Sequence, residues 1–256
     1  MSQSSVPWIS VVIPIKDERD NLHPLTNQLT KVLSGIEASQ KAPFEIIFVD
    51  DGSIDGSSTI LDELVAQSPE VQVLHLDGNH GQTAAFDAGF RHARGTLIAT
   101  LDGDLQYDPA DLAKLLPLAD QYDLVCGHRQ QRLDNIVRKL SSRIANFVRN
   151  AVIHDGIQDT GCSLKVFRRA VIERIPLFRN MHRFFPALAQ MYGFSVTEVP
   201  VQHFPRAHGH SKYGIGNRVF AGLYDLFAVR WMQQRSFRYR IVDHPPTPQG
   251  PPKPTA

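Results

Sequence analysis

The first half of the chain alternates short apolar runs with segments of helical spacing, and this alternation limits the possible folds more than any other feature. We predict strands at 9–15, 44–49, 71–76, 96–101 and 124–126, with helices between them at 21–38, 57–67, 82–93 and 109–119. Because these strands are apolar throughout rather than at alternate positions, both faces of the sheet should be covered by helices. The sequence therefore predicts an α/β protein with a mostly parallel sheet flanked by helices on both faces.

The second half is less regular. It predicts helices at 133–153, 184–192 and 217–235 and strands at 163–167 and 195–201. The last residues are rich in proline and are predicted to be disordered. We divide the chain into an N-terminal tail (1–8), an α/β domain (9–216), an amphipathic helix (217–240) and a disordered tail (241–256).

Charge is distributed unevenly along the chain. The net charge is only +1, but residues 1–125 hold 7 Lys and Arg against 19 Asp and Glu, whereas residues 126–256 hold 20 against 7. The basic half favours a phosphate-bearing substrate or a membrane surface as its partner, although it could also pair only with the acidic half. Nucleic acid is disfavoured, because the acidic half would repel it and no nucleic-acid motif is present.

Cysteine usage and the N-terminus indicate a cytoplasmic protein. Cys126 and Cys162 are too few and too widely spaced for a disulfide framework or a zinc ribbon. The N-terminus lacks the pattern of a signal peptide, and no apolar run reaches the roughly 18 residues that would span a bilayer.

Three acidic clusters follow predicted strands, at 16–18, 50–53 and 102–104. Parallel strands end on the same edge of a sheet, where α/β proteins bind ligands, so these loops should converge. One like-charged pair at 4 Å costs about 4 kcal/mol at an effective dielectric of 20. A divalent cation, or hydrogen bonds to a base and ribose, would relieve that repulsion. A lone Asp-x-Asp is more often only an acidic turn. We predict a metal–diphosphate site at Asp102 and Asp104 because the three acidic loops are expected to lie close together.

Several segments together resemble family 2 glycosyltransferases, in particular the polyprenyl-phosphate branch typified by dolichol-phosphate mannose synthase and undecaprenyl-phosphate sugar transferases. The resemblance extends from about residue 9 to 232 and is carried by 11–14 with Glu18, 48–53, 79–85, 101–106, 127–129, 159–168 and 209–214. It implies the GT-A fold. It also implies inverting transfer of a hexose-type sugar from a UDP- or GDP-linked donor to undecaprenyl or dolichyl phosphate, at the cytoplasmic face of the inner membrane.

The resemblance also implies a role for each residue of the donor site. Pro14, Glu18 and Asp50 would contact the base and ribose, and Asp51 would support that loop or the diphosphate. Ligands for Mg²⁺ or Mn²⁺ would come from Asp102, Asp104 and Gln106, where the metal neutralises charge on the leaving diphosphate. Four further residues complete the set that binds the nucleotide sugar: Gln82, Gly103, Arg206 and Lys212.

The acceptor phosphate is already anionic, so its attack should need positioning more than a general base. The resemblance assigns this positioning to Arg129, Arg138 and Ser142, with help from Ser211. It counts Arg129 and Arg138 with Asp102 and Asp104 as the catalytic group. Arg206 and Lys212 lie in a loop that would close over the donor and acceptor phosphates, and Asp159 would lie at the floor of the reaction site.

Other features allow two interpretations. The helix after 217 carries aromatic residues suited to a membrane surface, but it could equally pack on the core or dock on a membrane protein partner; these residues are Phe220, Tyr224, Phe227 and Trp231. His203, His208 and His210 lack a fourth ligand at zinc spacing, so a loop that binds phosphate is favoured over zinc. For His203, a position in an exposed loop without a ligand is favoured over both. We interpret a further set of arginines as solvated charges: Arg143, Arg149, Arg168 and Arg169.

Rival functions remain open. The same donor site could serve a soluble or polysaccharide acceptor, or the protein could be a module that binds nucleotide sugars without turnover. A phosphatase of the Asp-x-Asp type is disfavoured. It needs a nucleophilic Asp after the first strand, within an Asp-x-Asp that is soon followed by a Thr, and this sequence has neither pattern.

Overall fold

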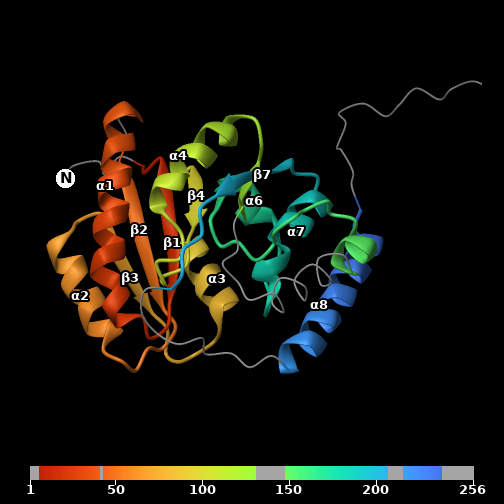
Figure 1. The fold of residues 1–256 in the computed structure, drawn as a ribbon, viewed down its shortest axis with the longest axis horizontal. Helices are drawn as coiled ribbons and strands as arrows, with labels where there is room; N and C mark the ends of the chain where they lie inside the picture. The colour runs from red at the N-terminus through yellow and green to blue at the C-terminus, as the bar shows by residue number, and fades with distance from the viewer. Residues whose placement is uncertain (1–5, 41–42, 131–147, 207–215, 238–256) are drawn as a thin grey trace, which may run out of the picture.

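A computed structural model describes residues 6–40, 43–130, 148–206 and 216–237. Its centre is one seven-stranded sheet in the order β3-β2-β1-β4-β6-β5-β7 (Figure 1). The strands are β1 (Ile9–Ile15), β2 (Phe44–Asp50), β3 (Val71–His75), β4 (Leu97–Thr100), β5 (Leu124–Arg129), β6 (Lys165–Arg168) and β7 (Val196–Val201).

The sheet is mostly parallel, which confirms the prediction. β1 pairs in parallel with β2 and β4, β2 with β3, and β5 with β7. Only β6 runs antiparallel to its neighbours β4 and β5. Ile15 lies opposite Asp50, so β1 and β2 end together and their acidic loops leave the same edge of the sheet.

Helices cover both faces of the sheet (Figure 1). One core contains side chains of α1 (Leu22–Gln40), α2 (Ser57–Gln67) and α4 (Leu112–Leu115). The other contains side chains of α3 (Gln82–His92), α6 (Arg169–Arg174), α7 (Phe185–Met191) and α8 (Gly216–Arg235). Within β1, Val11 and Ile13 enter the first core while Val12 enters the second, because successive strand residues point to opposite faces.

Some local expectations were wrong. The helix predicted at 109–119 is divided into η2 (Pro109–Asp111), α4 and η3 (Leu116–Asp120). A proline lies at the first or second position of both η2 and η3, where the missing N–H of proline favours a helix start over its continuation. β5 is three residues longer than predicted, and α6, η1 (Arg19–Asn21) and η4 (Met181–Phe184) were not predicted. Most of the helix predicted at 133–153 lies outside the described residues; 148–153 are helical.

The interpretation of Arg149 as a solvated charge was also wrong. Its side chain is 7% exposed, pairs with Asp155 at 3.3 Å and donates to Thr160 Oγ1 at 2.8 Å. Arg168 and Arg169 donate to backbone carbonyls, those of Ala119 and Asp120 for Arg168 and those of Ala93 and Gly95 for Arg169. Arg143 lies outside the described residues.

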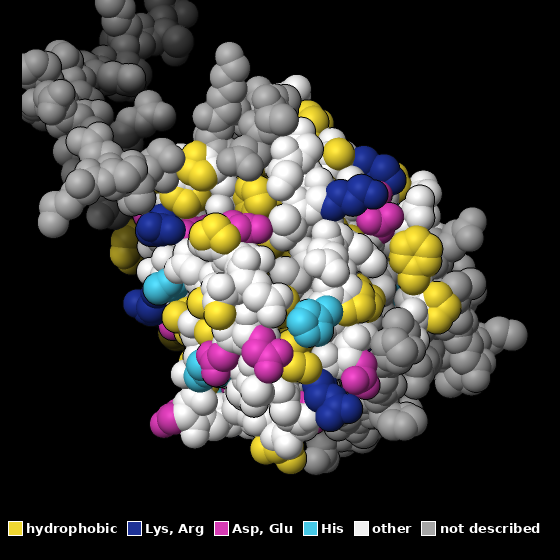
Figure 2. Space-filling model, turned by 90° about the vertical axis from the view of Figure 1, so that its left-hand side faces the viewer, with side chains coloured by type: hydrophobic (Ala, Val, Ile, Leu, Met, Phe, Trp, Pro, Cys, Tyr) yellow, Lys and Arg dark blue, Asp and Glu magenta, His cyan; other side chains and the backbone are white. Residues whose placement is uncertain are grey.

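Among the described residues, no helix combines the length and apolarity needed to cross a membrane. Acidic, basic and apolar side chains are interspersed on the face that lies to the left in Figure 1, where α1 and α2 are found (Figure 2).

Candidate active site

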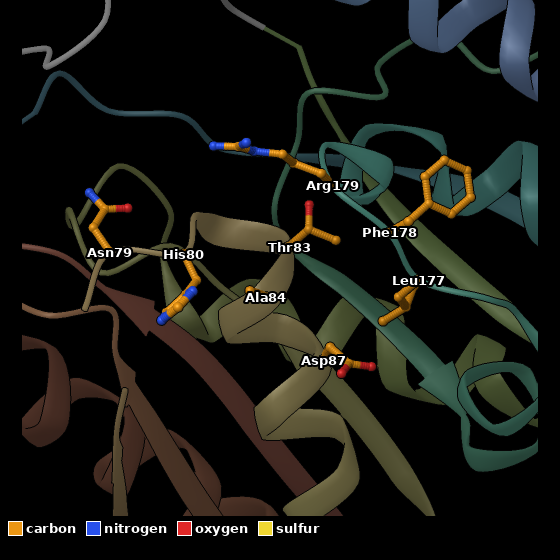
Figure 3. Close-up of a pocket in the computed structure, with 8 residues that line it drawn as sticks. All are labelled: Asn79, His80, Thr83, Ala84, Asp87, Leu177, Phe178 and Arg179. Atoms are coloured by element: carbon orange, nitrogen blue, oxygen red, sulfur yellow. The ribbon is translucent and has the colours of Figure 1, made fainter. Parts of the chain in front are cut away.

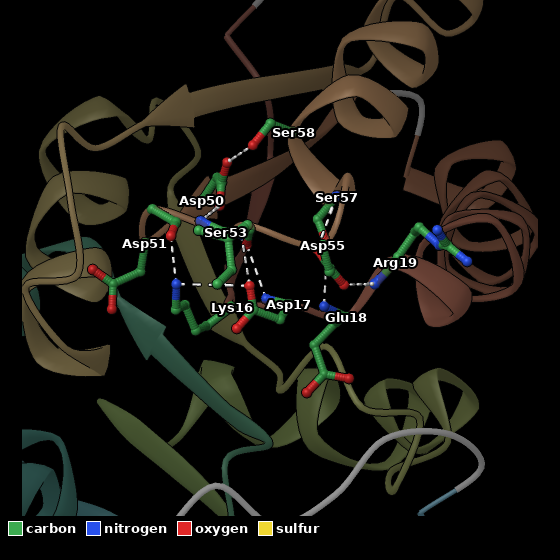
Figure 4. A network of polar contacts seen from close by, with 12 residues as sticks. Lys16, Asp17, Glu18, Arg19, Asp50, Asp51, Ser53, Asp55, Ser57 and Ser58 are labelled. Atoms are coloured by element: carbon green, nitrogen blue, oxygen red, sulfur yellow. Dashed lines mark hydrogen bonds and ion pairs between the residues drawn. The ribbon is translucent and has the colours of Figure 1, made fainter.

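The loops after β1 and β2 are joined by hydrogen bonds at the carboxyl edge of the sheet (Figure 4). The Asp17 N–H donates to Ser53 Oγ at 2.9 Å, and the Glu18 N–H donates to Ser57 Oγ at 3.1 Å. In return, the Ile54 N–H donates to Asp17 Oδ1 at 2.7 Å. These bonds hold Asp17 at φ +48°, a left-handed conformation that non-glycine residues adopt rarely and mostly where the surroundings impose it.

Asp50 is buried at the end of β2 and already accepts hydrogen bonds on both oxygens. Oδ1 accepts from the Ser53 N–H at 2.9 Å, and Oδ2 lies 2.5 Å from Ser58 Oγ and 3.0 Å from His75 Nδ1. Burial would raise the pKa of Asp50, but the hydrogen bonds from Ser53, Ser58 and His75 lower it below its ordinary value. Asp50 is therefore an ionised side chain that organises its own loop.

Asp51 joins the β2 loop to the start of α3. Its two carboxylate oxygens accept the backbone N–H groups of His80 at 2.6 Å and Gly81 at 2.9 Å. Lys16 donates to the Gly52 carbonyl and lies 3.7 Å from Asp17. The loops after β1, β2 and β3 are thus held as one unit.

Asp102 and Asp104 follow β4 at the same edge. Gln82, the first residue of α3, donates from Nε2 to Asp102 Oδ1 at 2.8 Å, and Ser163 Oγ accepts the Asp102 N–H at 3.2 Å. Burial and the charge of Asp104 raise the pKa of Asp102 to about 6, against the opposing effects of Ser163, Lys165 and Arg129. The two carboxylates therefore repel each other, as the sequence predicted.

Arg206 connects this pair to the first loop. Its Nη2 lies 2.7 Å from Asp104 Oδ2, and its Nη1 lies 3.8 Å from Glu18 Oε1. Gln106 bonds with its N–H to Asp104 Oδ1 and with its side-chain nitrogen to the Phe204 carbonyl, at 3.2 and 3.3 Å. Residues from the ends of β1 and β4 and from the segment after β7 (Val196–Val201) therefore meet around Asp104.

Gly103 is required for packing rather than for an unusual backbone angle. A Cβ there would lie 2.5 Å from Ile15 Cδ1 and 3.5 Å from the Pro14 carbonyl oxygen. Leu105, not Gly103, adopts the left-handed conformation of this turn, at φ +58°. The absence of a side chain at Gly103 lets the Asp102–Asp104 turn lie directly against the end of β1.

Arg129 forms a two-bond pair with Asp159. Its Nε and Nη2 donate to the two carboxylate oxygens at 2.7 and 2.8 Å, and both side chains are mostly buried. Glu198 on β7 accepts the N–H groups of Gln158 and Asp159 at 2.8 and 3.0 Å, which fixes the loop that carries Asp159. The Nε–Nη2 edge of the Arg129 guanidinium is therefore occupied by Asp159.

Sequence reasoning did not find several residues that shape this edge: Ser57, Ser58, Ser163 and Glu198. Their contacts with Glu18, Asp50, Asp102 and Asp159 join positions 8 to 61 apart along the chain, so no local spacing signals these contacts. Four predicted residues lie outside the described part of the chain: Arg138, Ser142, Ser211 and Lys212. His208 and His210 lie outside it too, whereas the His203 ring packs against Tyr107 with centroids 5.3 Å apart.

The donor set at Asp102 and Asp104 fits a cation that a diphosphate helps to hold. Within the described ranges, no three or more His, Cys, Asp and Glu side chains are grouped to hold a metal by themselves. Mg²⁺ is usually bound by one or two carboxylates together with substrate phosphates, so two suffice. Burial first, and the charge of Asp104 second, raise the pKa of Asp102, and a bound cation would offset the second of these effects.

The fold is that of the GT-A glycosyltransferases. Glucosyl-3-phosphoglycerate synthase from Mycobacterium tuberculosis, solved with Mn²⁺, UDP and glucosyl-3-phosphoglycerate, superposes with a TM-score of 0.63 at 14% identity, over 89% of this chain and 80% of that one. A mannosyltransferase from Pyrobaculum calidifontis, solved with GDP-Man and Mn²⁺, gives 0.59 at 18% identity, over 91% of this chain and 66% of that one.

The chain belongs to glycosyl transferase family 2, whose sequence profile matches residues 10–176. It is 38% identical over 225 residues to the undecaprenyl-phosphate 4-deoxy-4-formamido-L-arabinose transferase of Edwardsiella ictaluri, covering 87% of this chain and 67% of that protein. It is 36% identical over 236 residues to the dodecaprenyl-phosphate galacturonate synthase of Rhizobium johnstonii, covering 90% and 68%. The family resemblance inferred from the motifs is therefore confirmed.

Proposed function

We propose that this protein transfers a hexose-type sugar from a UDP- or GDP-linked donor to a polyprenyl phosphate, with inversion at the anomeric carbon. The observation that carries the proposal is the meeting of Glu18, Asp102, Asp104 and Arg206 at the edge where parallel strands end. The two named relatives, whose names specify undecaprenyl and dodecaprenyl phosphate, support the acceptor class.

The donor nucleoside would lie against the joined loops after β1 and β2. Pro14 and Glu18 would contact the base and ribose. Asp50 would orient its loop and offer a remaining lone pair to a ribose hydroxyl, since both its oxygens already hold protein partners. Asp51 would keep the start of α3 (Gln82–His92) in place beside the diphosphate.

Asp102 and Asp104 would hold Mg²⁺ or Mn²⁺ with the donor diphosphate, and Gln106 would complete the set. When bound, the metal neutralises the negative charge that develops on the leaving diphosphate. Gln82 would keep Asp102 oriented through its 2.8 Å hydrogen bond. Arg206, which contacts both Asp104 and Glu18, would contribute a second positive charge to the same region.

The acceptor phosphate would be positioned by Arg129, Arg138 and Ser142, with Ser211 from the segment after Arg206. Lys212 of that segment would help to bind the nucleotide sugar. A phosphate oxygen of the acceptor forms the new bond to the anomeric carbon while the bond to the diphosphate oxygen breaks. No proton must be removed, because the attacking oxygen is anionic at neutral pH. Asp159 would keep the Arg129 guanidinium in one orientation through its two hydrogen bonds.

The reaction would take place at the cytoplasmic face of the inner membrane, with the protein bound peripherally. Exposed aromatic side chains on α8 (Gly216–Arg235) support this location: Tyr224, Phe227 and Trp231. Arg235 at the end of the helix suits an anionic lipid surface.

A transfer assay tests the proposal. Purified protein is incubated with labelled UDP- and GDP-sugars, Mn²⁺ and either a short-chain polyprenyl phosphate or oligosaccharides. We expect labelled lipid, loss of labelling with EDTA, and loss of turnover in Asp104→Asn. Transfer to oligosaccharides alone would contradict the acceptor, and donor binding without any turnover would contradict an enzyme.

A further inference from the structure

A pocket of about 400 Å³ lies beside the candidate active site, between the start of α3 and the segment after α6 (Figure 3). This volume lies within the range of ordinary small-molecule sites. The pocket is lined by Asn79, His80, Thr83, Ala84, Asp87, Leu177, Phe178 and Arg179. Apart from the backbone N–H of His80, which binds Asp51, none of these residues has a role in the donor or acceptor sites described above.

The pocket has a charged end and an apolar end. In Figure 3, Arg179 extends over Thr83 toward His80 and Asn79, while Leu177 and Phe178 lie on the side of Asp87. Within the described ranges, no carboxylate lies at ion-pair distance from Arg179, whereas Asp87 is paired with Arg91 at 2.8 Å. The Arg179 guanidinium is exposed. The charge that the pocket offers to a ligand is therefore positive at this end.

The segment 79–83 connects the pocket to the catalytic edge. His80 lines the pocket with its side chain while its backbone N–H binds Asp51. Gln82 binds Asp102, and the next residue, Thr83, lines the pocket and contacts His182 Nδ1 at 2.7 Å. A ligand in the pocket would therefore lie one residue from the side chain that orients Asp102.

The apolar end continues toward the exposed aromatic side chains of α8. Phe178 is 39% exposed. Two residues later, Asn180 lies close enough to Asp225 on α8 to oppose the rise that burial causes in the pKa of Asp225, so this end of the pocket wall is near that helix. Tyr224, next to Asp225, is 77% exposed. An apolar chain leaving the pocket past Phe178 would have aromatic surface beside it.

We propose that this pocket binds a prenyl monophosphate, with Arg179 pairing with the phosphate and with Leu177 and Phe178 packing on the first isoprene units. A guanidinium suits a phosphate because it forms two parallel charge-assisted hydrogen bonds. The inference rests on the proposed function: the lipid acceptor of that reaction would first dock in this pocket, and its phosphate would then leave Arg179 for Arg129, Arg138 and Ser142, because a single phosphate cannot occupy both places.

Direct binding tests the inference independently of transfer. Farnesyl phosphate, farnesol and inorganic phosphate are titrated into the full chain by calorimetry, without nucleotide sugar. We expect farnesyl phosphate to bind at least tenfold more tightly than either of the other two, because only it uses both ends of the pocket. Farnesyl phosphate that binds no better than inorganic phosphate, or does not bind, would overturn the inference.

Variants locate the site. Arg179→Ala should weaken farnesyl phosphate about tenfold, and Arg179→Lys should weaken it less. Phe178→Ala should weaken farnesyl phosphate without changing the binding of inorganic phosphate. Arg174→Ala serves as the matched control, because Arg174 is an exposed arginine at the end of α6 that does not line the pocket. Equal affinities in Arg179→Ala and Arg174→Ala would place the ligand elsewhere and refute the assignment.

The transfer assay separates this inference from the proposed function. If the function holds, Arg179→Ala should raise the KM for short-chain polyprenyl phosphate and leave the KM for the nucleotide sugar unchanged. A raised KM for the nucleotide sugar alone would show that the pocket holds the sugar and would overturn the inference. Farnesyl phosphate that binds through Arg179 to a protein without transfer activity would support the inference and contradict the function.

Discussion

At the scale of single residues, the hydrogen-bond and charge partners of each carboxylate determine whether it can shape the site or bind a cation. Both carboxylate oxygens of Asp50 and of Asp51 accept hydrogen bonds from other groups of the protein, whereas desolvation and the charge of Asp104 raise the pKa of Asp102 to about 6. The first two therefore shape the edge of the sheet. The Asp102–Asp104 pair is the one that a cation would stabilise.

The pair of Arg129 and Asp159 makes a testable contribution to stability. Asp159→Ala should lower the free energy of unfolding by about 3 kcal/mol, because it leaves a mostly buried guanidinium without its carboxylate. Adding Arg129→Met should restore part of that loss, since the double variant buries no lone charge. Urea denaturation measures both values.

A surface pair provides the control for this prediction. Asp20→Ala should change the free energy of unfolding by less than about 1 kcal/mol, because the Arg19–Asp20 pair is largely exposed. An Asp159→Ala variant as stable as Asp20→Ala would mean that the Arg129–Asp159 pair does not stabilise the fold.

Glu45 predicts a pH dependence of stability. Burial would raise its pKa, but hydrogen bonds from Ser10 and Arg94 hold it below the ordinary value of 4.5. A lowered pKa in the folded protein means that the stabilisation is complete above pH 4.5 and is lost as the pH falls through the folded pKa. Glu45→Gln should therefore cost about 1–3 kcal/mol at pH 7 and progressively less below pH 4.5.

Urea denaturation over a pH series tests this expectation, with Glu63→Gln at an exposed position of α2 as the control. A difference between wild type and Glu45→Gln that stays constant down to pH 3 would argue against an ionised, hydrogen-bonded Glu45.

At the scale of elements, the ends of the strands are held in register by close packing. Gly103→Ala should destabilise the protein by about 1–3 kcal/mol, because the added Cβ would lie 2.5 Å from Cδ1 of the fully buried Ile15. In an Ile15→Val background that methyl group is absent, so the same substitution should cost less. Thermal unfolding of the four combinations measures the coupling; equal costs in both backgrounds would contradict the packing argument.

The elements themselves were largely predictable from the sequence, because unbroken apolar strands and helical spacing report directly on burial. β1 and α2 have the predicted bounds, and the convergence of the acidic loops follows from parallel pairing alone. The antiparallel direction of β6 was not predictable, since an apolar run carries no information on strand direction. Arg149 was misjudged because the sequence does not show that Arg149 and Asp155 are both buried in the folded chain, where they form an ion pair.

We predicted that the α/β domain ends at residue 216 and that the amphipathic helix begins at 217. In the structure α8 begins at Gly216, but the division of the chain into these two parts stays a prediction. The assigned donor and acceptor roles stay predictions as well. They depend on ligands whose positions no residue pattern specifies.

At the scale of the whole molecule, α8 has one face in the core and another exposed. Leu226 and Val229 are buried, while Phe227 is 63% and Trp231 is 61% exposed. If the exposed face binds a membrane surface, vesicles rich in phosphatidylglycerol should shift Trp231 fluorescence to shorter wavelength, more at low salt than at high salt. Vesicles of phosphatidylcholine alone should shift it less.

A matched pair of variants completes this test. Phe227→Ser should reduce vesicle binding, whereas Val65→Ser on α2, where the side chain is also partly exposed, should not. Tryptophan fluorescence that does not respond to any vesicle would favour packing or protein docking as the role of this face.

If Asp102 and Asp104 hold a cation that binds the donor diphosphate, nucleotide affinity should depend on the metal and on both carboxylates, and calorimetric titration of UDP and GDP measures this dependence. We expect Mn²⁺ to tighten binding of one of these nucleotides at least tenfold in the wild type, and Asp102→Asn to remove most of this gain. In a control variant, Asp87→Asn, the gain should persist. Nucleotide affinity that is the same with Mn²⁺ and with EDTA, or that Asp102→Asn leaves unchanged, would contradict the account.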